Sequence, residues 1–199
     1  MTAENKVQFG LKNVHIAEAT DDGVNLTYAE PWRLRGAVEI SLDPSGETNP
    51  FYADDTDFYD AVSNQGYTGK LTIATLTDQF REKILGDKYD DNGLLVESNS
   101  NKQSNFAMMF EFDGDQTQTR HVLYNVSATR PSLGGKTKED KTEPDTQELE
   151  FTASPDPYTG QPKAKTTAKT PQAIFDKWYT EVQVPTFTEA PVEEPTPKV

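Results

Sequence analysis

A long acidic segment between two strand-like runs places the tightest constraint on this fold. Residues Gly36–Asp43 and Gly66–Thr75 both have the pattern of strands. Between Gly36 and Gly69 the chain has seven acidic residues and no lysine or arginine. Ordering a long connection between paired strands costs backbone entropy, so such a segment is seldom kept for stability alone. We therefore expect it to form a long loop that contacts another molecule. Because the chain has no set of residues suited to catalysis, the expected contact is another protein.

Apolar residues that alternate with polar ones predict strands with one buried and one polar face. The clearest case is Val38–Asp43, and the pattern returns in later segments, for six or seven expected strands. A short helix is expected over Asp78–Leu85, capped by Thr77, with Phe80 and Ile84 turned to the sheet. The predicted class is a β-dominated α+β fold. It has two packed antiparallel sheets, as a sandwich or partial barrel, with a flanking short helix and a long inter-strand loop.

The length predicts one domain over residues 1–184, followed by a Pro- and Glu-rich tail over 185–199. A second helix is expected over 171–182, with Pro171 at its first position. The net charge of −14 excludes a protein that wraps DNA phosphates, but an acidic wall is suited to a passage that DNA must not adhere to. We find no signal segment and no apolar run that would span a membrane, and expect no membrane partner.

No pattern in the chain predicts an enzyme, a metal site or a cofactor. The two histidines, His15 and His121, have no cysteine partners, because the chain has none. The segment 87–93 resembles a calcium loop only in part. Counting back from Gly93 puts Lys88 at the first position of the loop and Asn99 at the twelfth, where acids are required. The acids of the long loop show no spacing that singles out a glycosidase pair. They are better suited to a weak calcium site than to hydrolysis, and the expected cofactor is none.

Aromatic residues in and after the acidic segment allow two interpretations. They either fold back on their own sheet or act as anchors buried against a neighbouring subunit. The residues concerned are Phe51, Tyr52, Phe58, Tyr59 and Tyr67.

Several segments together resemble the major tail (tail tube) proteins of long, non-contractile-tailed bacteriophages and prophages of Gram-positive hosts. The order is strand, acidic loop, strand with glycine, short helix and strand hairpin, and the similarity covers most of Lys6–Pro155. The segments that carry it are Val38–Asp43, Phe51–Asp55, Asn64–Gly69 and Thr142–Leu149.

The resemblance implies a structural virion protein, assembled in the host cytoplasm, whose hexameric rings stack into a hollow tube. The tube would hold the tape-measure protein, join other tail proteins and later pass the genome without binding it specifically. The loop Asp43–Gln65 would reach the neighbouring ring. Its expected contact residues are Asn49, Phe51, Tyr52, Asp54, Asp55, Asp57, Phe58, Tyr59 and Asp60.

The resemblance also implies a sheet around the lumen. Its strands would be Gly36–Leu42, Lys70–Thr75, Phe106–Phe112 and Arg120–Ala128. By the alternation of side chains along these strands, five residues are expected to face the channel: Glu39, Ser41, Thr72, Glu111 and Asn125. Five others are expected to face the core: Val38, Ile40, Leu71, Phe110 and Val126.

Lys163, Lys165 and Lys169 share one parity of a polar, strand-like stretch. We hypothesise that these lysines meet the acidic loop across the contact between rings, where exposed pairs would set register more than affinity. The alternative function is a monomeric β-sandwich module that binds carbohydrate or a surface partner, with the aromatics as its platform. Self-assembly without a ligand separates the two.

Overall fold

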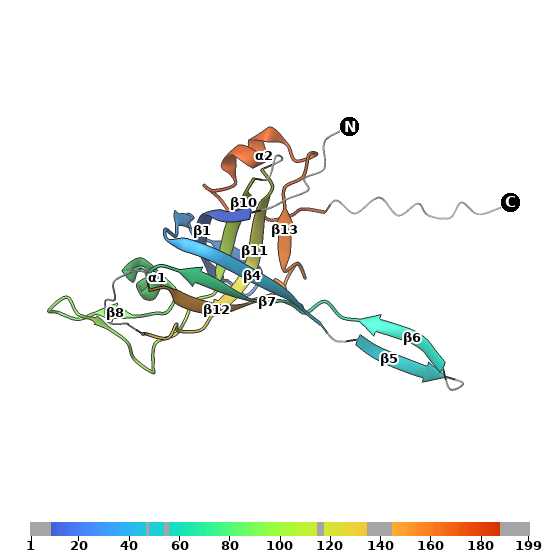
Figure 1. The fold of residues 1–199 in the computed structure, drawn as a ribbon, viewed down its shortest axis with the longest axis horizontal. Coiled ribbons are helices and arrows are strands. Elements are labelled where there is room, and N and C mark those ends of the chain that lie inside the picture. Colours follow the sequence, from blue (N-terminus) through green and yellow to red (C-terminus); the bar gives the residue numbers. More distant parts are fainter. Residues whose placement is uncertain (1–8, 47, 54–55, 115–117, 135–144, 188–199) are drawn as a thin grey trace, which may run out of the picture.

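The fold is β-dominated, as expected. The computed structural model describes residues 9–46, 48–53, 56–114, 118–134 and 145–187 (Figure 1). Its elements in chain order are β1 Phe9–Asp21, β2 Leu26–Tyr28, β3 Trp32–Arg33, β4 Ala37–Ser45, β5 Thr48–Ala53, β6 Thr56–Val62, β7 Gly66–Ile73, α1 Asp78–Lys83, β8 Lys88–Tyr89, β9 Leu95–Val96, β10 Phe106–Asp113, β11 Arg120–Ala128, β12 Gln147–Ser154, β13 Lys163–Lys165 and α2 Gln172–Lys177.

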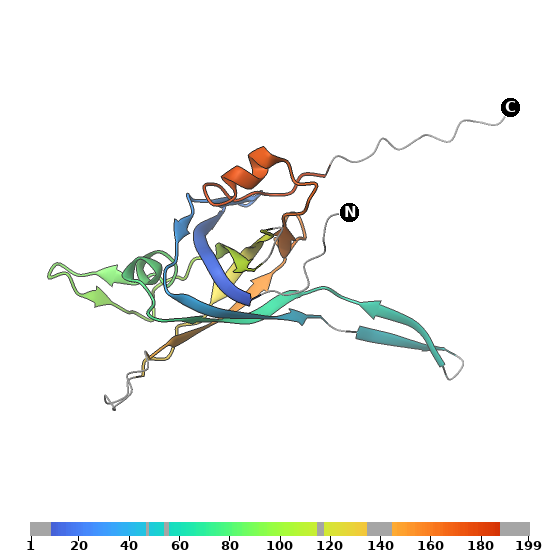
Figure 2. The same ribbon diagram turned by 45° about the horizontal axis from the view of Figure 1, so that its top comes forward.

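One large antiparallel sheet forms the body, and both layers of the body come from it. The main strand order is β2-β1-β10-β11-β12-β7-β4, with β3 paired to β1 and β13 paired to β11. The sheet curls so that β4 approaches β1, but the described residues form no ladder between these two strands. The result is a barrel that is not fully closed (Figure 2).

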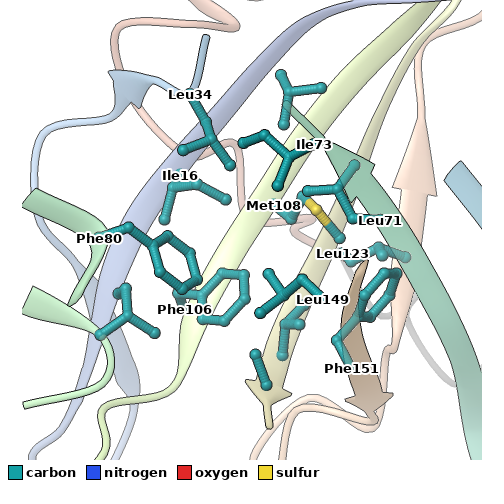
Figure 3. Packing of buried hydrophobic residues seen from close by; sticks show 14 of the residues in the cluster. Ile16, Leu34, Leu71, Ile73, Phe80, Phe106, Met108, Leu123, Leu149 and Phe151 are labelled. Atoms are coloured by element: carbon teal, nitrogen blue, oxygen red, sulfur yellow. The ribbon is translucent and has the colours of Figure 1, made fainter. Parts of the chain in front are cut away.

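The main core lies inside this curl. Leu71 and Leu149, from β7 and β12, face Met108 of β10 across it (Figure 3). The helix α1 closes one side, because Phe80 packs edge-on against Phe106 with ring centroids 5.6 Å apart. Thr77 caps the helix as expected, because its hydroxyl accepts a hydrogen bond from the Phe80 amide.

A second, smaller core lies on the opposite face of β10 and β11. It contains Met109, Val122 and Tyr124 from the sheet and Trp178 from the segment after α2. The predicted helix over 171–182 is shorter than expected: α2 ends at Lys177 and a turn follows. Both faces of β10 are therefore buried.

The predicted long loop is a β-ribbon. Strands β5 and β6 pair with each other, in continuation of the β4–β7 pair, and project from the body (Figures 1 and 2). The Gln65 amide donates to the Ser45 carbonyl at 2.8 Å, where the ribbon meets the body. We call this ribbon, residues 48–62, the arm. Its acids and Pro50 are depleted in strands, which is why the sequence pattern indicates a loop. The pairing of β5 with β6 gives backbone groups of the arm hydrogen-bond partners.

The expected lumen sheet left out one strand of the sheet. The structure places β12 between β11 and β7. The core assignment of Val38 is also wrong, since 55% of this residue is exposed. A register shift between Ala37 and Glu39 interrupts the alternation there, so that Ala37 packs on the core in its place.

Candidate assembly surfaces

The outward side of β4, β7 and β12 is a continuous polar surface. Neighbouring positions on the three strands form rows across it, one of which is Glu39, Thr72 and Glu148. We call this surface the polar face, and its members are Glu39, Ser41, Asp43, Thr68, Lys70, Thr72, Glu148, Glu150 and Thr152. Three of the predicted channel residues, Glu39, Ser41 and Thr72, thus lie together on one face.

Lys70 is the one cation of the polar face, and two glutamates of the same face neutralise its charge. Its Nζ lies 2.6 Å from Glu148 Oε1 and 3.1 Å from Glu150 Oε1. The hydrogen bond to Glu148, followed by that to Glu150, raises the pKa of the Lys70 ammonium above its ordinary value. The face is therefore acidic overall and repels polyanions.

Gly69 allows β4, β7 and β12 to pack closely. It lies opposite Phe151 in the ladder, and a Cβ atom at this position would be 2.6 Å from Cζ of that ring. The same atom would be 2.4 Å from the Ser41 carbonyl oxygen. Only a residue without a side chain fits here.

The variant Gly69→Ala is expected to lower the free energy of unfolding by about 1–3 kcal/mol, because the ring and the strand backbone must both shift. Gly134→Ala is the matched control, since nothing lies within 4 Å of its added Cβ. Urea denaturation of both variants measures the difference. Equal midpoints would show that the packing around Gly69 is looser than described.

The remaining two predicted channel residues do not belong to the polar face. Glu111 is 5% exposed, so its assignment to a channel is wrong. The second core covers this face of β10, and alternation alone gives no sign of a second layer. Asn125 is half-buried, where its amide oxygen accepts from Asn105 Nδ2 at 2.7 Å and its Nδ2 donates to the Pro155 carbonyl at 3.3 Å.

Glu111 is the centre of a buried ionic cluster. Its Oε1 accepts a hydrogen bond from Asn13 Nδ2 at 2.7 Å and lies 3.7 Å from Lys12 Nζ. Its Oε2 lies 3.4 Å from Arg120 Nε. The Arg120 guanidinium also lies 3.7 Å from the centroid of the Phe175 ring and hydrogen-bonds to the Phe175 carbonyl. The cluster thereby ties the C-terminal segment to the sheet.

An aromatic contact completes the cluster, and the sequence pattern did not predict it. The His15 ring stacks on Tyr179 with centroids 4.4 Å apart. Burial, and then the nearby Glu111 charge, raise the pKa of the Tyr179 hydroxyl. Burial lowers the pKa of His15. His15 and Tyr179 lie 164 positions apart in the chain (179 − 15), so only the folded structure brings them together.

The predicted contact residues of the long loop are distributed over the arm. Asn49, Phe51 and Tyr52 lie in β5, and the ladder places Phe51 opposite Tyr59 of β6. Asp54 and Asp55 lie outside the described residues. The other members of the predicted set lie in β6 and are Asp57, Phe58, Tyr59 and Asp60.

The three lysines do not share one strand face, so that part of the hypothesis is wrong. Lys163 and Lys165 lie in β13, but Lys169 lies in a turn beyond the strand, where strand alternation does not apply. The Lys163 ammonium is 4.1 Å from the centroid of the Tyr67 ring, a cation–π contact within its own chain. Lys165 is exposed.

Among the described residues, no group of histidine and acidic side chains is arranged to hold a metal ion. His121, one of the two histidines considered as metal ligands, instead stacks on Phe110 with ring centroids 5.2 Å apart. No helix within the described ranges is long and apolar enough to cross a membrane.

The sequence matches the family described as "Phage tail tube protein" over residues 3–194. The chain therefore belongs to the phage tail tube protein family, and is a structural component of a phage tail. A search of curated proteins found no match.

Two solved structures align with most of this chain at low similarity. A cryo-EM structure of the anti-feeding prophage cap (AFP tube terminating cap) aligns with a TM-score of 0.48 and 10% identity, over 84% of this chain and 98% of that chain. A cryo-EM structure of the anti-feeding prophage baseplate, 6-fold symmetrised, aligns with a TM-score of 0.47 and 11% identity, over 85% and 100%. At this similarity neither structure supports an inference about function.

Proposed function

We propose that this chain is a non-enzymatic tail tube subunit that self-assembles into stacked, hexameric rings. The observation that carries the proposal is the arm, which continues the β4–β7 pair away from the body. A two-stranded ribbon is marginally stable by itself, so an arm of this kind gains order by docking on another molecule. Family membership makes another copy of the chain the natural partner.

The polar face is the proposed wall of the lumen. Its side chains are all polar, with four carboxylates and a single lysine, and that lysine is paired to two of them. Such a wall repels DNA phosphates, so that a genome slides without adhering. The rows of side chains run across three strands, as a wall built from adjoining sheets requires.

Ring closure is the proposed answer to the open sheet. In the described residues the outer edge of β4 pairs with no other strand. Open edges pair readily with other chains, and a closed ring of subunits removes them. In this proposal the lumen holds the tape-measure protein, and the tube joins other tail proteins in the long non-contractile tail of a phage or prophage of a Gram-positive host. Assembly takes place in the host cytoplasm.

Negative-stain electron microscopy across a concentration series, with sedimentation velocity on the same samples, tests the proposal. We expect rings and hollow tubes of uniform width, in proportions that rise with concentration and without any added ligand. A protein that stays monomeric at every concentration and instead binds a glycan or surface partner would overturn the proposal in favour of a binding module.

A further inference from the structure

A basic hollow lies at the start of β4, in a chain whose net charge is −14. It has a volume of about 470 Å³ and is lined by Leu11–Val14 of β1 and by the connection Arg33–Ala37. The lining includes Lys12, Arg33 and Arg35 but no acidic residue. We call this hollow the basic pocket. Its charge is opposite to that of the chain as a whole.

Two of the three cations are available to an incoming anion. Lys12 is already paired, with its Nζ 3.1 Å from Asp113 Oδ1. Arg33 and Arg35 are exposed, and neither guanidinium forms a hydrogen bond or ion pair with another described residue. Leu34 between them is 2% exposed and its amide donates to the Val14 carbonyl at 2.8 Å. The backbone around the two arginines is therefore held firmly.

The arm and the basic pocket lie at opposite ends of the same strand. The pocket precedes Ala37, where β4 begins, and the arm follows Ser45, where β4 ends. Nine residues of strand separate them by about 30 Å. Because the arm projects away from the body, it does not fill the pocket of its own chain (Figures 1 and 2). A contact between the two is therefore head to tail, and head-to-tail contacts build either closed rings or, where the rotation between copies does not close, open-ended stacks.

We propose that the acidic arm of one copy docks in the basic pocket of the next copy along the tube. This inference rests on the proposed function, and names the surface that receives the arm. The stretch from Gly36 to Gly69 contains no lysine or arginine, so the arm offers only acids to the two guanidiniums. Asp57 and Asp60 of β6 are its acids with a described backbone. Guanidinium and carboxylate form paired, charge-assisted hydrogen bonds, which fix geometry as well as adding affinity.

The basic pocket replaces the lysine stretch as the expected receiver. Lys163 is engaged with Tyr67, and Lys169 lies in a turn away from the strand. By contrast, Arg33 and Arg35 lie two residues apart on either side of one buried leucine, and line one hollow. Two cations that line one hollow match a ribbon rich in acids, whereas Lys165 and Lys169 lie on separate elements.

A charge swap tests the proposal with three variants of the full chain. The pocket variant carries Arg33→Asp and Arg35→Asp, the arm variant carries Asp57→Lys and Asp60→Lys, and the swap variant carries all four changes. We expect the pocket and arm variants each to raise the concentration needed for tube formation about tenfold or more, since each sets like charges against each other. The swap variant is expected to return close to the wild-type value.

The matched control is Lys165→Asp with Lys169→Asp, which changes the net charge as the pocket variant does. It should stay within about twofold of wild type, because it spares the pocket. Circular dichroism and thermal melting of each monomer show whether the variants fold. A pocket variant that assembles as well as wild type, or a swap variant no better than its halves, would overturn the inference while leaving tube formation intact.

Two other outcomes also count against the inference. If the wild-type protein never assembles, the proposed function fails and the docking contact fails with it. If the pocket variant assembles normally but loses binding of a short DNA duplex that wild type binds at low salt, the pocket receives phosphate in place of the arm.

Discussion

Deletion of residues 47–63 is expected to abolish tube formation and leave the body folded. The deletion removes the arm and joins β4 to β7 through Gly46, Asn64 and Gln65, a loop length that is common in hairpins. The core residues that the structure describes all come from outside the deleted segment. The melting temperature of the monomer should therefore stay within a few degrees of wild type, and electron microscopy should show no tubes at concentrations where wild type forms them.

The deletion variant also allows a mixing experiment. It keeps the basic pocket but has no arm, so a copy that joins a growing tube offers the next layer one contact fewer. Small amounts added to the wild-type protein should shorten the tubes in proportion to the amount added. Tubes formed by the deletion variant alone, or unchanged lengths in the mixture, would contradict a role of the arm in stacking.

Arg120→Met is expected to lower the free energy of unfolding by about 3–5 kcal/mol. The variant removes the arginine charge from beside buried Glu111, which keeps Asn13 and the more distant Lys12 as partners, and an insufficiently compensated buried charge is costly. It also removes the contacts that hold Phe175, so Trp178 in the second core should become more exposed. Urea denaturation followed by tryptophan fluorescence measures both effects.

The control for Arg120 is Lys177→Met, which breaks an exposed pair with Glu181. That pair should contribute little to stability, because water and salt screen exposed charges. The double variant Glu111→Gln with Arg120→Met should recover part of the stability, because it removes the buried charge itself. If Arg120→Met unfolds at the same urea concentration as Lys177→Met, the cluster does not hold the C-terminal segment.

Local patterns predicted the features that local physics determines. The capping of α1 by Thr77 and the burial of Phe80 and Ile84 follow from spacing within one helical turn. The burial of Leu71 follows from alternation in a strand with one buried face. The same alternation predicted that Glu39, Ser41 and Thr72 share one polar side of the sheet.

Features that depend on distant parts of the chain were not predictable in this way. Glu111 has the alternation of an outward residue, but a segment more than 60 positions later covers it. The prediction that Val38 faces the core was wrong because a register shift between β4 and β7 turns this residue outward. The basic pocket combines Lys12 with Arg33 and Arg35, and only the pairing of β1 with β3 brings those segments together.

Cryo-electron microscopy of tubes grown from the purified full chain is the most direct test of a self-assembling tube subunit. The account predicts stacked rings in which the polar face lines the lumen and each arm lies against the neighbouring ring. A protein that forms no tubes, or tubes in which the arms point into solvent and the polar face lies outside, would contradict it.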